Sequence, residues 1–242
     1  MNEIYILKVQ KGWLAVDKPC GISVHNDPGN DLVSLLSDKI KADQLLARNL
    51  GVDSSFGVHP VHRLDKETSG VILLAADNKM LSKLSDLFMK NQVKKTYITL
   101  VHGSFGQEKK KFQCWNFPLS KMAGGRNDPA GKGRRVECKT RYKVLQQSNR
   151  YSLLEIDLLT GRKHQIRRHA KLAGHPITGD SRYGSKKSVN YLKDTLSYDR
   201  LGLHCKSLEF VPPGQKEKIM IESRDLLTEM FQLLSKDDRS TI

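Results

Sequence analysis

The sequence predicts an α+β protein. Short apolar runs with strand character mix with segments of helical periodicity, and their order lacks the strict strand–helix–strand repeat of an α/β fold. The chain has 242 residues, of which 38% are hydrophobic, so it is long and apolar enough to bury a core. Its longest clearly apolar stretches, such as 71–76, are far shorter than the roughly 20 residues that span a bilayer. A membrane protein is therefore not expected.

The N-terminal half is expected to alternate between strands and helices. Residues 13–18, which begin with the apolar run 13–16 and end at Pro19, predict a short strand. Leucines and isoleucine at helical spacing predict one helix over 31–49 that ends near Gly51. The elements that follow are a buried strand over 70–75, a helix with Asp77 as its N-cap, and a strand over 96–101 that ends at Gly103.

The C-terminal half begins with a segment rich in glycine and basic residues. We interpret 120–135 as a mobile basic loop within a single domain that covers 1–242, rather than as a linker. The turn at Thr160 and Gly161 leads into a helix, for which Gly174 suits the C′ position. The expected elements are strands over about 137–145 and 151–159, a helix over about 163–173, and a last helix over about 224–235 with an apolar stripe in the core.

The chain is strongly basic. Lys and Arg number 41 against 26 Asp and Glu, which gives a formal net charge of +15. The excess is clustered within 109–143 and 162–171, and such clusters are typical of proteins that bind nucleic acid. A generally basic solvated surface is the alternative. The four cysteines lie far apart without a CxxC pair, and the N-terminus lacks a signal peptide pattern, so we expect a protein of the reducing cytoplasm.

The first candidate site precedes the strand over 70–75. Asp65 lies between Arg63 and Lys66 and is expected to stay ionised, because nearby positive charge stabilises a carboxylate. An ionised Asp where the chain enters a buried strand is suited to act as a nucleophile or a base. One alternative is an ordinary charged turn. Another is a metal site formed by His59, His62 and Asp65, but a single short cluster without a cysteine pair gives it little support.

Two further segments carry groups suited to nucleic acid. The strand–turn–helix over 158–169 places His164, Arg167, Arg168 and Lys171 on one side of a helix, where they and its N-terminus would hold a phosphate or a catalytic carboxylate. A solvated basic face is the alternative. Tyr97 follows two lysines in an expected strand, so it either stacks on a base or fills the core.

Taken together, these motifs resemble the RluA-type family of RNA pseudouridine synthases. The resemblance runs from about 12 to 223, with the motifs in the family's order. The two most specific motifs are His62-Arg63-Leu64-Asp65 with Thr68-Ser69-Gly70, and Thr160-Gly161-Arg162-Lys163-His164-Gln165-Ile166-Arg167. The others are Asp17-Lys18-Pro19 with Gly21, Lys95-Thr96-Tyr97, His175-Pro176-Ile177 with Gly179-Asp180 and Tyr183-Gly184, and Leu203-His204 with Leu208.

The resemblance implies a fold and an activity. The fold is a mixed, mostly antiparallel curved sheet flanked by helices, with a central active-site cleft. The activity is the isomerisation of uridine to pseudouridine in structured ribosomal or transfer RNA, without cofactor or metal. Because the first motif begins at Asp17, no N-terminal S4 domain is expected. DNA and membrane partners are not expected, and the absence of a surplus apolar helix favours a monomer. The rival interpretation is a non-catalytic RNA-binding or ribosome-assembly protein with the same fold.

The resemblance also implies roles for individual residues. Asp65 is the catalytic carboxylate, Tyr97 stacks on the target uracil, and Arg167 pairs with Asp65, although Arg162 and Arg167 could exchange roles. Because a uridine in folded RNA must be flipped out to react, Arg63 is expected to fill the gap or hold a phosphate. The residues expected to contact RNA are Arg63, Arg126, Arg134, Arg135, Arg162, Lys163, His164, Arg168 and Lys171.

Overall fold

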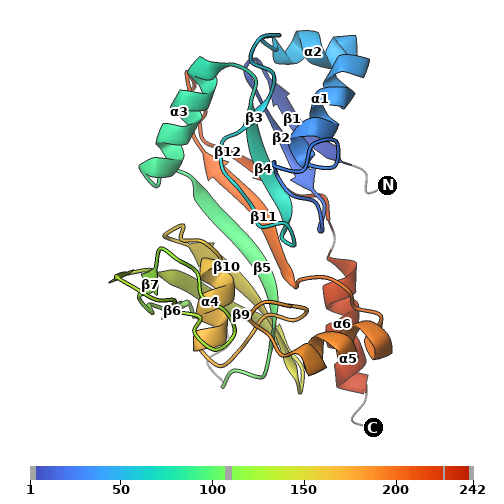
Figure 1. Cartoon of the computed structure of the whole chain (residues 1–242), viewed down its shortest axis with the longest axis vertical. Coiled ribbons are helices and arrows are strands. Elements are labelled where there is room, and N and C mark those ends of the chain that lie inside the picture. The colour runs from blue at the N-terminus through green and yellow to red at the C-terminus, as the bar shows by residue number, and fades with distance from the viewer. Residues whose placement is uncertain (1–3, 107–110, 226, 240–242) are drawn as a thin grey trace. The chain divides into compact units, whose positions relative to one another are not determined.

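The computed structural model describes residues 4–106, 111–225 and 227–239. The chain forms two compact units. The first unit runs to Lys95 and includes Cys205–Asp225, and the second comprises Thr96–His204 with the C-terminal segment. Strands β5 (Lys94–His102) and β11 (Leu203–Phe210) each have residues in both units. Strands and helices are mixed along the chain, as Figure 1 shows, which confirms the α+β prediction.

The first unit is built on antiparallel strands. Strand β2 pairs with β1 on one side and with β4 on the other. Every residue of β2 and β4 is buried, because apolar side chains face both sides of these strands. Strand β11 follows β4 in the strand order. The strands of this unit besides β11 are β1 (Tyr5–Gln10), β2 (Trp13–Lys18), β3 (His59–Pro60), β4 (Ser69–Ala75) and β12 (Ile219–Glu222).

Two helices replace the single helix predicted over 31–49, so that prediction was wrong. Helix α1 (Leu32–Ala42) ends and α2 (Gln44–Leu50) begins at Asp43, whose backbone is extended at φ −115°. The Asp43 carboxylate accepts a hydrogen bond from the Leu46 amide and caps α2, an interaction that competes with a continuous helix. Helix α2 packs on β1 (Figure 1).

Helix α3 of the first unit agrees with its prediction. It spans Asn78–Met89, and the Asp77 side chain accepts from the Met80 amide at 2.7 Å, which confirms Asp77 as the N-cap. The helix packs on β4, the strand that follows the turn with Asp65. The helix predicted to begin after Asp77 therefore packs against β4.

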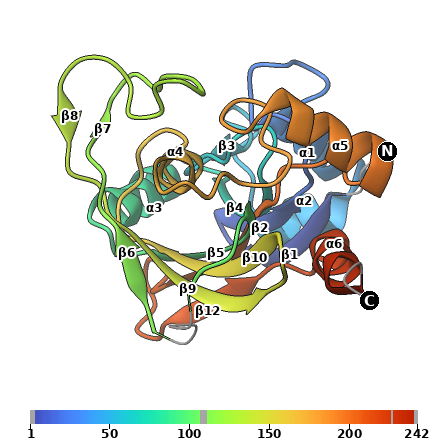
Figure 2. The same cartoon turned by 90° about the horizontal axis from the view of Figure 1, so that it is seen from below.

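The second unit has its own antiparallel strands. Strand β10 (Tyr151–Leu158) lies between β5 and β9 (Thr140–Gln147), and β6 (Gln113–Trp115) pairs with β9. The strands predicted over 137–145 and 151–159 are thus present, with β9 beginning three residues later than expected. A separate hairpin pairs β7 (Leu119–Ser120) with β8 (Arg135–Val136), as Figure 2 shows.

The helices of the second unit differ in part from the predictions. Helix α4 (Gln165–Leu172) begins two residues later than expected, because His164 has a left-handed backbone at φ 53°. Helix α5 (Lys186–Leu196) was not predicted. Helix α6 (Thr228–Arg239) begins later than expected, and it buries Met230 and Leu234 while Phe231 is 43% exposed. Within the described ranges, no helix is both long and apolar enough to cross a lipid bilayer.

Candidate active site

A tight turn carries Asp65 into β4. The Thr68 amide donates to the Asp65 carbonyl at 3.0 Å, which closes the turn. Asp65 is half-buried, while the two cations that flank it, Arg63 and Lys66, are exposed. The turn thus places a half-buried carboxylate between two exposed cations. Exposed positive charge attracts an anionic polymer to the carboxylate.

Lys18 braces this turn from inside the first unit. Its side chain is 1% exposed, and burial lowers the pKa of its ammonium to about 8, against the opposing charges of Cys20, Asp65 and Glu67. The Gly21 amide donates to the same Lys66 carbonyl as Lys18. The three carbonyls that accept from Lys18 Nζ are those of Pro19 (2.8 Å), Ile22 (2.9 Å) and Lys66 (3.1 Å).

This role of Lys18 was not predicted from the sequence. A lysine at the end of an otherwise apolar strand was the available signal, because burying an ammonium requires several acceptors. The structure shows that these acceptors belong to the turn after β2 and to the turn with Asp65. Lys18 therefore fixes the backbone next to the proposed catalytic carboxylate.

Gly70 allows a close backbone approach directly after this turn. Its φ is +110°, and a Cβ atom at this position would lie 2.2 Å from the Cys205 carbonyl oxygen. A side chain here would be both strained and in collision with backbone. The Thr68-Ser69-Gly70 motif thus has a packing reason: it lets β4 begin against the backbone of Cys205.

His62 is engaged in structure rather than exposed for metal binding. Its Nε2 accepts from the Leu73 amide at 3.1 Å, and its ring stacks on Phe88 with centroids 4.5 Å apart. Burial, together with the charge of Lys95, lowers its pKa to about 3, so the ring is neutral near pH 7. His59 Nε2 contacts the Phe56 carbonyl at 3.0 Å. Among the described residues, no three His, Cys, Asp or Glu side chains gather as metal ligands.

Arg167 lies buried in α4 of the second unit. It is 1% exposed, and it binds Asp180 with two parallel hydrogen bonds of 2.9 Å from Nε and Nη2. Asp180 also accepts from the amides of Arg182 and Tyr183. This geometry fixes the guanidinium plane. The predicted pairing of Arg167 with Asp65 involves the other unit and stays a prediction.

Arg168 requires a correction. It was expected on the solvent face of the helix as a phosphate contact, but it is completely buried. Its guanidinium donates to the carbonyls of Ser120, Pro129, Ala130 and Lys163. A side chain with its donors engaged in this way is a structural anchor rather than an RNA contact.

The other predicted residues of this segment lie before α4 and in its last turn. Arg162 and Lys163 are exposed and Lys171 is half-buried, so the three cations retain access to solvent. The His164 Nδ1 atom lies 3.0 Å from the Tyr183 hydroxyl. The Arg162 amide donates to the buried Gln165 side chain at 3.0 Å, so Gln165 holds the turn that carries Arg162.

Tyr97 and the basic loop complete the predicted set. Tyr97 lies on β5 opposite Ile156 and is 6% exposed. The segment 120–135 has a defined course that closes through the β7–β8 hairpin. Arg134 and Arg135 are exposed, whereas Arg126 is half-buried and donates to the Ser181 carbonyl at 3.1 Å.

Comparisons with known proteins give a consistent result. Residues 12–172 match a family model described as RNA pseudouridylate synthase. The chain is 31% identical to tRNA pseudouridine synthase C of Haemophilus ducreyi, over 96% of this chain and 94% of that protein. It is 32% identical to ribosomal large subunit pseudouridine synthase C of Buchnera aphidicola, over 89% of this chain and 65% of that protein. The solved structure of human RNA pseudouridylate synthase domain containing 4 superposes with a TM-score of 0.70 at 25% identity, over 95% of this chain and 92% of that one.

Proposed function

The chain belongs to the RNA pseudouridylate synthase family, and on this premise we propose which of its residues perform the reaction. The activity is the isomerisation of uridine in RNA to pseudouridine. The bond between N1 and C1′ breaks, the uracil turns, and a bond forms between C5 and C1′. The proton on C5 leaves to solvent and N1 takes up a proton, so product and substrate have the same composition.

We propose that Asp65 is the catalytic carboxylate. It acts on the ribose either as a nucleophile at C1′ or as a base at C2′, and both routes require an ionised group on a fixed backbone. The observation that carries this proposal is the turn that Lys18 and Gly21 hold through the Lys66 carbonyl. A carboxylate on a backbone fixed in this way needs little reorganisation during the reaction.

The other roles follow from the motifs that resemble the family. Tyr97 stacks its ring on the target uracil, and Arg167 pairs with Asp65 and orients it. Arg63 is exposed beside Asp65, where it fills the gap left by the flipped nucleotide or holds the displaced phosphate. Arg162 contacts a phosphate from the turn before α4.

We propose a uridine in transfer or ribosomal RNA as the substrate, bound by a monomer in the cytoplasm. Sequencing of carbodiimide-modified pseudouridines in total RNA, from cells with and without the gene, identifies the target. We expect specific sites to disappear with the gene. The exposed cations of the basic loop and of the turn before α4 supply the RNA affinity, namely Arg134, Arg135, Arg162 and Lys163. The half-buried Arg126, His164 and Lys171 complete the set of residues expected to contact RNA.

Replacing Asp65 tests the proposed function directly. We expect Asp65→Asn to abolish tritium release from RNA labelled with [5-³H]uridine, because the amide is neutral and neither attacks C1′ nor accepts a proton from C2′. The variant should keep the fold and the RNA affinity, since Asn has nearly the same shape.

Asp86→Asn is the matched control, because Asp86 lies on α3 and forms only a surface ion pair with Lys90. This control should release tritium at the wild-type rate. Near-normal turnover of Asp65→Asn would overturn the assignment of Asp65. Tight RNA binding by the wild-type protein with no tritium release would favour the non-catalytic RNA-binding protein instead.

A further inference from the structure

The buried guanidinium of Arg168 is surrounded by carbonyl oxygens of the basic loop. It is 0% exposed. Its Nε donates to Pro129 O at 2.6 Å, and its Nη2 donates to Ala130 O at 2.6 Å. Its Nη1 donates to Ser120 O at 3.1 Å and to Lys163 O at 3.2 Å. Three of these four acceptors belong to 120–135, so one side chain of α4 joins the start of that loop to its later part at Pro129 and Ala130.

Neighbouring side chains hold the same backbone. His169 follows Arg168 in α4, and its Nε2 lies 2.9 Å from the Phe117 carbonyl. Burial lowers the pKa of His169 to about 4, so the ring is neutral near pH 7 and donates this hydrogen bond. Arg182 Nη2 donates to Gly124 O at 3.0 Å and to Ala123 O at 3.3 Å. Side chains outside the loop thus bind its backbone at two places, through the carbonyls of Ser120, Pro129 and Ala130 and through those of Ala123 and Gly124.

The loop is also closed on itself. The Ser120 amide donates to the Ala130 carbonyl at 2.9 Å. Gly131 has φ +76°, and a Cβ atom there would lie 2.2 Å from the Met122 carbonyl oxygen, so the backbone packs too closely for a side chain. These contacts define one conformation for the loop.

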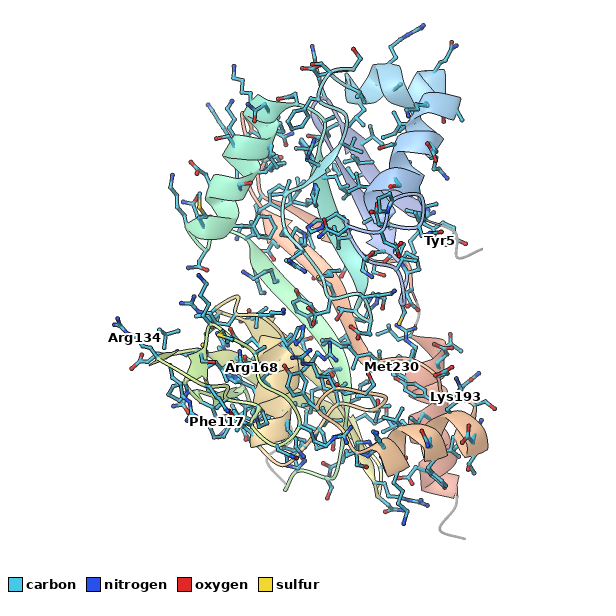
Figure 3. All side chains as sticks on the ribbon, in the orientation of Figure 1. Tyr5, Phe117, Arg134, Arg168, Lys193 and Met230 are labelled. Atoms are coloured by element: carbon cyan, nitrogen blue, oxygen red, sulfur yellow. The ribbon has the colours of Figure 1, made fainter. Side chains whose placement is uncertain are left out.

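The outer side of the loop carries the charge. Lys121, Lys132, Arg134 and Arg135 are exposed. In Figure 3, Arg134 lies at the outer edge of the hairpin and Arg168 lies deeper, against α4. A loop whose carbonyls bind Arg168 and whose cations are exposed offers a surface suited to a phosphate backbone. A loop ordered before RNA binds loses less entropy on binding than a flexible one.

We propose that Arg168 is a positioning residue that orders the 120–135 loop so that its exposed cations bind the RNA substrate. This inference rests on the proposed function and adds a residue that acts on the substrate only through the loop. The arginine is required for its geometry, because four acceptors around a planar group match the donors of a guanidinium and exceed those of an ammonium.

Arg168→Lys and Arg168→Met separate this role from a phosphate contact. Both variants should open the loop, which trypsin reports as cleavage after Lys121, Lys132, Arg134 or Arg135. We expect that cleavage to accelerate about tenfold, while cleavage at the exposed Lys193 of α5 stays at the wild-type rate. Both should raise KM for the RNA about tenfold and leave kcat within about twofold, since the reacting groups lie elsewhere.

Lys193→Met is the control for the loss of one positive charge, and it should change neither the loop cleavage nor KM. General destabilisation would instead lower kcat and raise cleavage at all sites. If Arg168→Lys binds RNA like the wild type, or if its loop resists trypsin, the positioning role is overturned. Loop cleavage that rises without a change in KM overturns the link to RNA. The cleavage measurement needs no RNA, so a wild-type protein without isomerase activity would refute the proposed function and leave this test intact.

Discussion

At the scale of single residues, buried charged side chains near the candidate residues hold the backbone or another side chain in place. Lys18 binds three carbonyls, Arg167 binds Asp180 with both its Nε and Nη2 atoms, and Arg168 binds four carbonyls. Each is buried, and a buried charge is tolerated only with several partners of good geometry. In each unit, buried charged groups that do not themselves need to react thus fix the structure next to the candidate residues.

The burial of His62 predicts how the stability of the protein depends on pH. Its pKa is about 3 in the folded protein and about 6.5 when unfolded, so between these values the unfolded chain binds more protons. Its contribution to stability is therefore fully present above pH 6.5 and is lost as the pH falls toward 3. We expect the wild type to lose about 2 kcal/mol more than His62→Gln between pH 7.5 and 5.0.

Urea unfolding at the two pH values measures this difference. The Gln side chain keeps an acceptor for the Leu73 amide but does not titrate in this range. His59→Gln, at an exposed position, is the control. Equal pH dependence in His62→Gln and the wild type would show that His62 is not buried in its neutral form.

At the scale of elements, one glutamine joins α4 to the neighbouring strand. Gln165 is 2% exposed, and its Oε1 accepts from the Thr160 hydroxyl and the Arg162 amide. Its Nε2 donates to the Lys139 carbonyl and the Thr140 hydroxyl. All four hydrogen-bonding positions of the amide are used. The turn that carries Arg162 is therefore fixed against β9.

Gln165→Glu tests this junction with almost no change in shape. The carboxylate has no donors for Lys139 and Thr140, and it buries a charge, so we expect the free energy of unfolding to fall by about 2–3 kcal/mol. Gln146→Glu adds the same charge at an exposed position of β9 and should have little effect. Equal stability of the two variants in urea unfolding would mean that the junction contributes nothing.

At the scale of the whole molecule, charge governs association with RNA. The chain carries 41 Lys and Arg against 26 Asp and Glu, and binding to a polyanion gains free energy when counterions are released. Affinity should therefore fall steeply as salt rises. The cations of the basic loop are the side chains expected to set this dependence.

The salt dependence of RNA binding distinguishes direct contacts from general charge. We expect Arg134→Ala and Arg135→Ala each to reduce the slope of log K against log salt by about 0.7–0.9, the value for one lost phosphate contact. Filter binding across a series of KCl concentrations measures the slope. Lys193→Met removes one charge from α5 and should leave the slope unchanged. Slopes unaffected by the two arginine variants would exclude phosphate contacts of Arg134 and Arg135.

Local sequence patterns were sufficient to predict the fold class, several elements and the family of this protein. The α+β class, the N-cap at Asp77, the strand over 13–18 and the motif around Asp65 all follow from contacts or periodicities within a few residues. The family is also readable from the motifs, because their order and spacing are properties of the chain. The basic clusters that indicate RNA can also be located in the sequence, because they depend only on the order of residues along the chain.

Only the tertiary structure decided which cations are exposed to solvent and which are buried and bind backbone carbonyls. Arg134 and Arg168 have the same side chain, and helical spacing placed Arg168 among solvent-facing residues. Whether a guanidinium meets water or carbonyls depends on segments distant in sequence, here Ser120 and Ala130 around Arg168. The break at Asp43 shows the same limit at short range, because a side chain that competes for backbone hydrogen bonds divides an otherwise continuous apolar pattern into two helices.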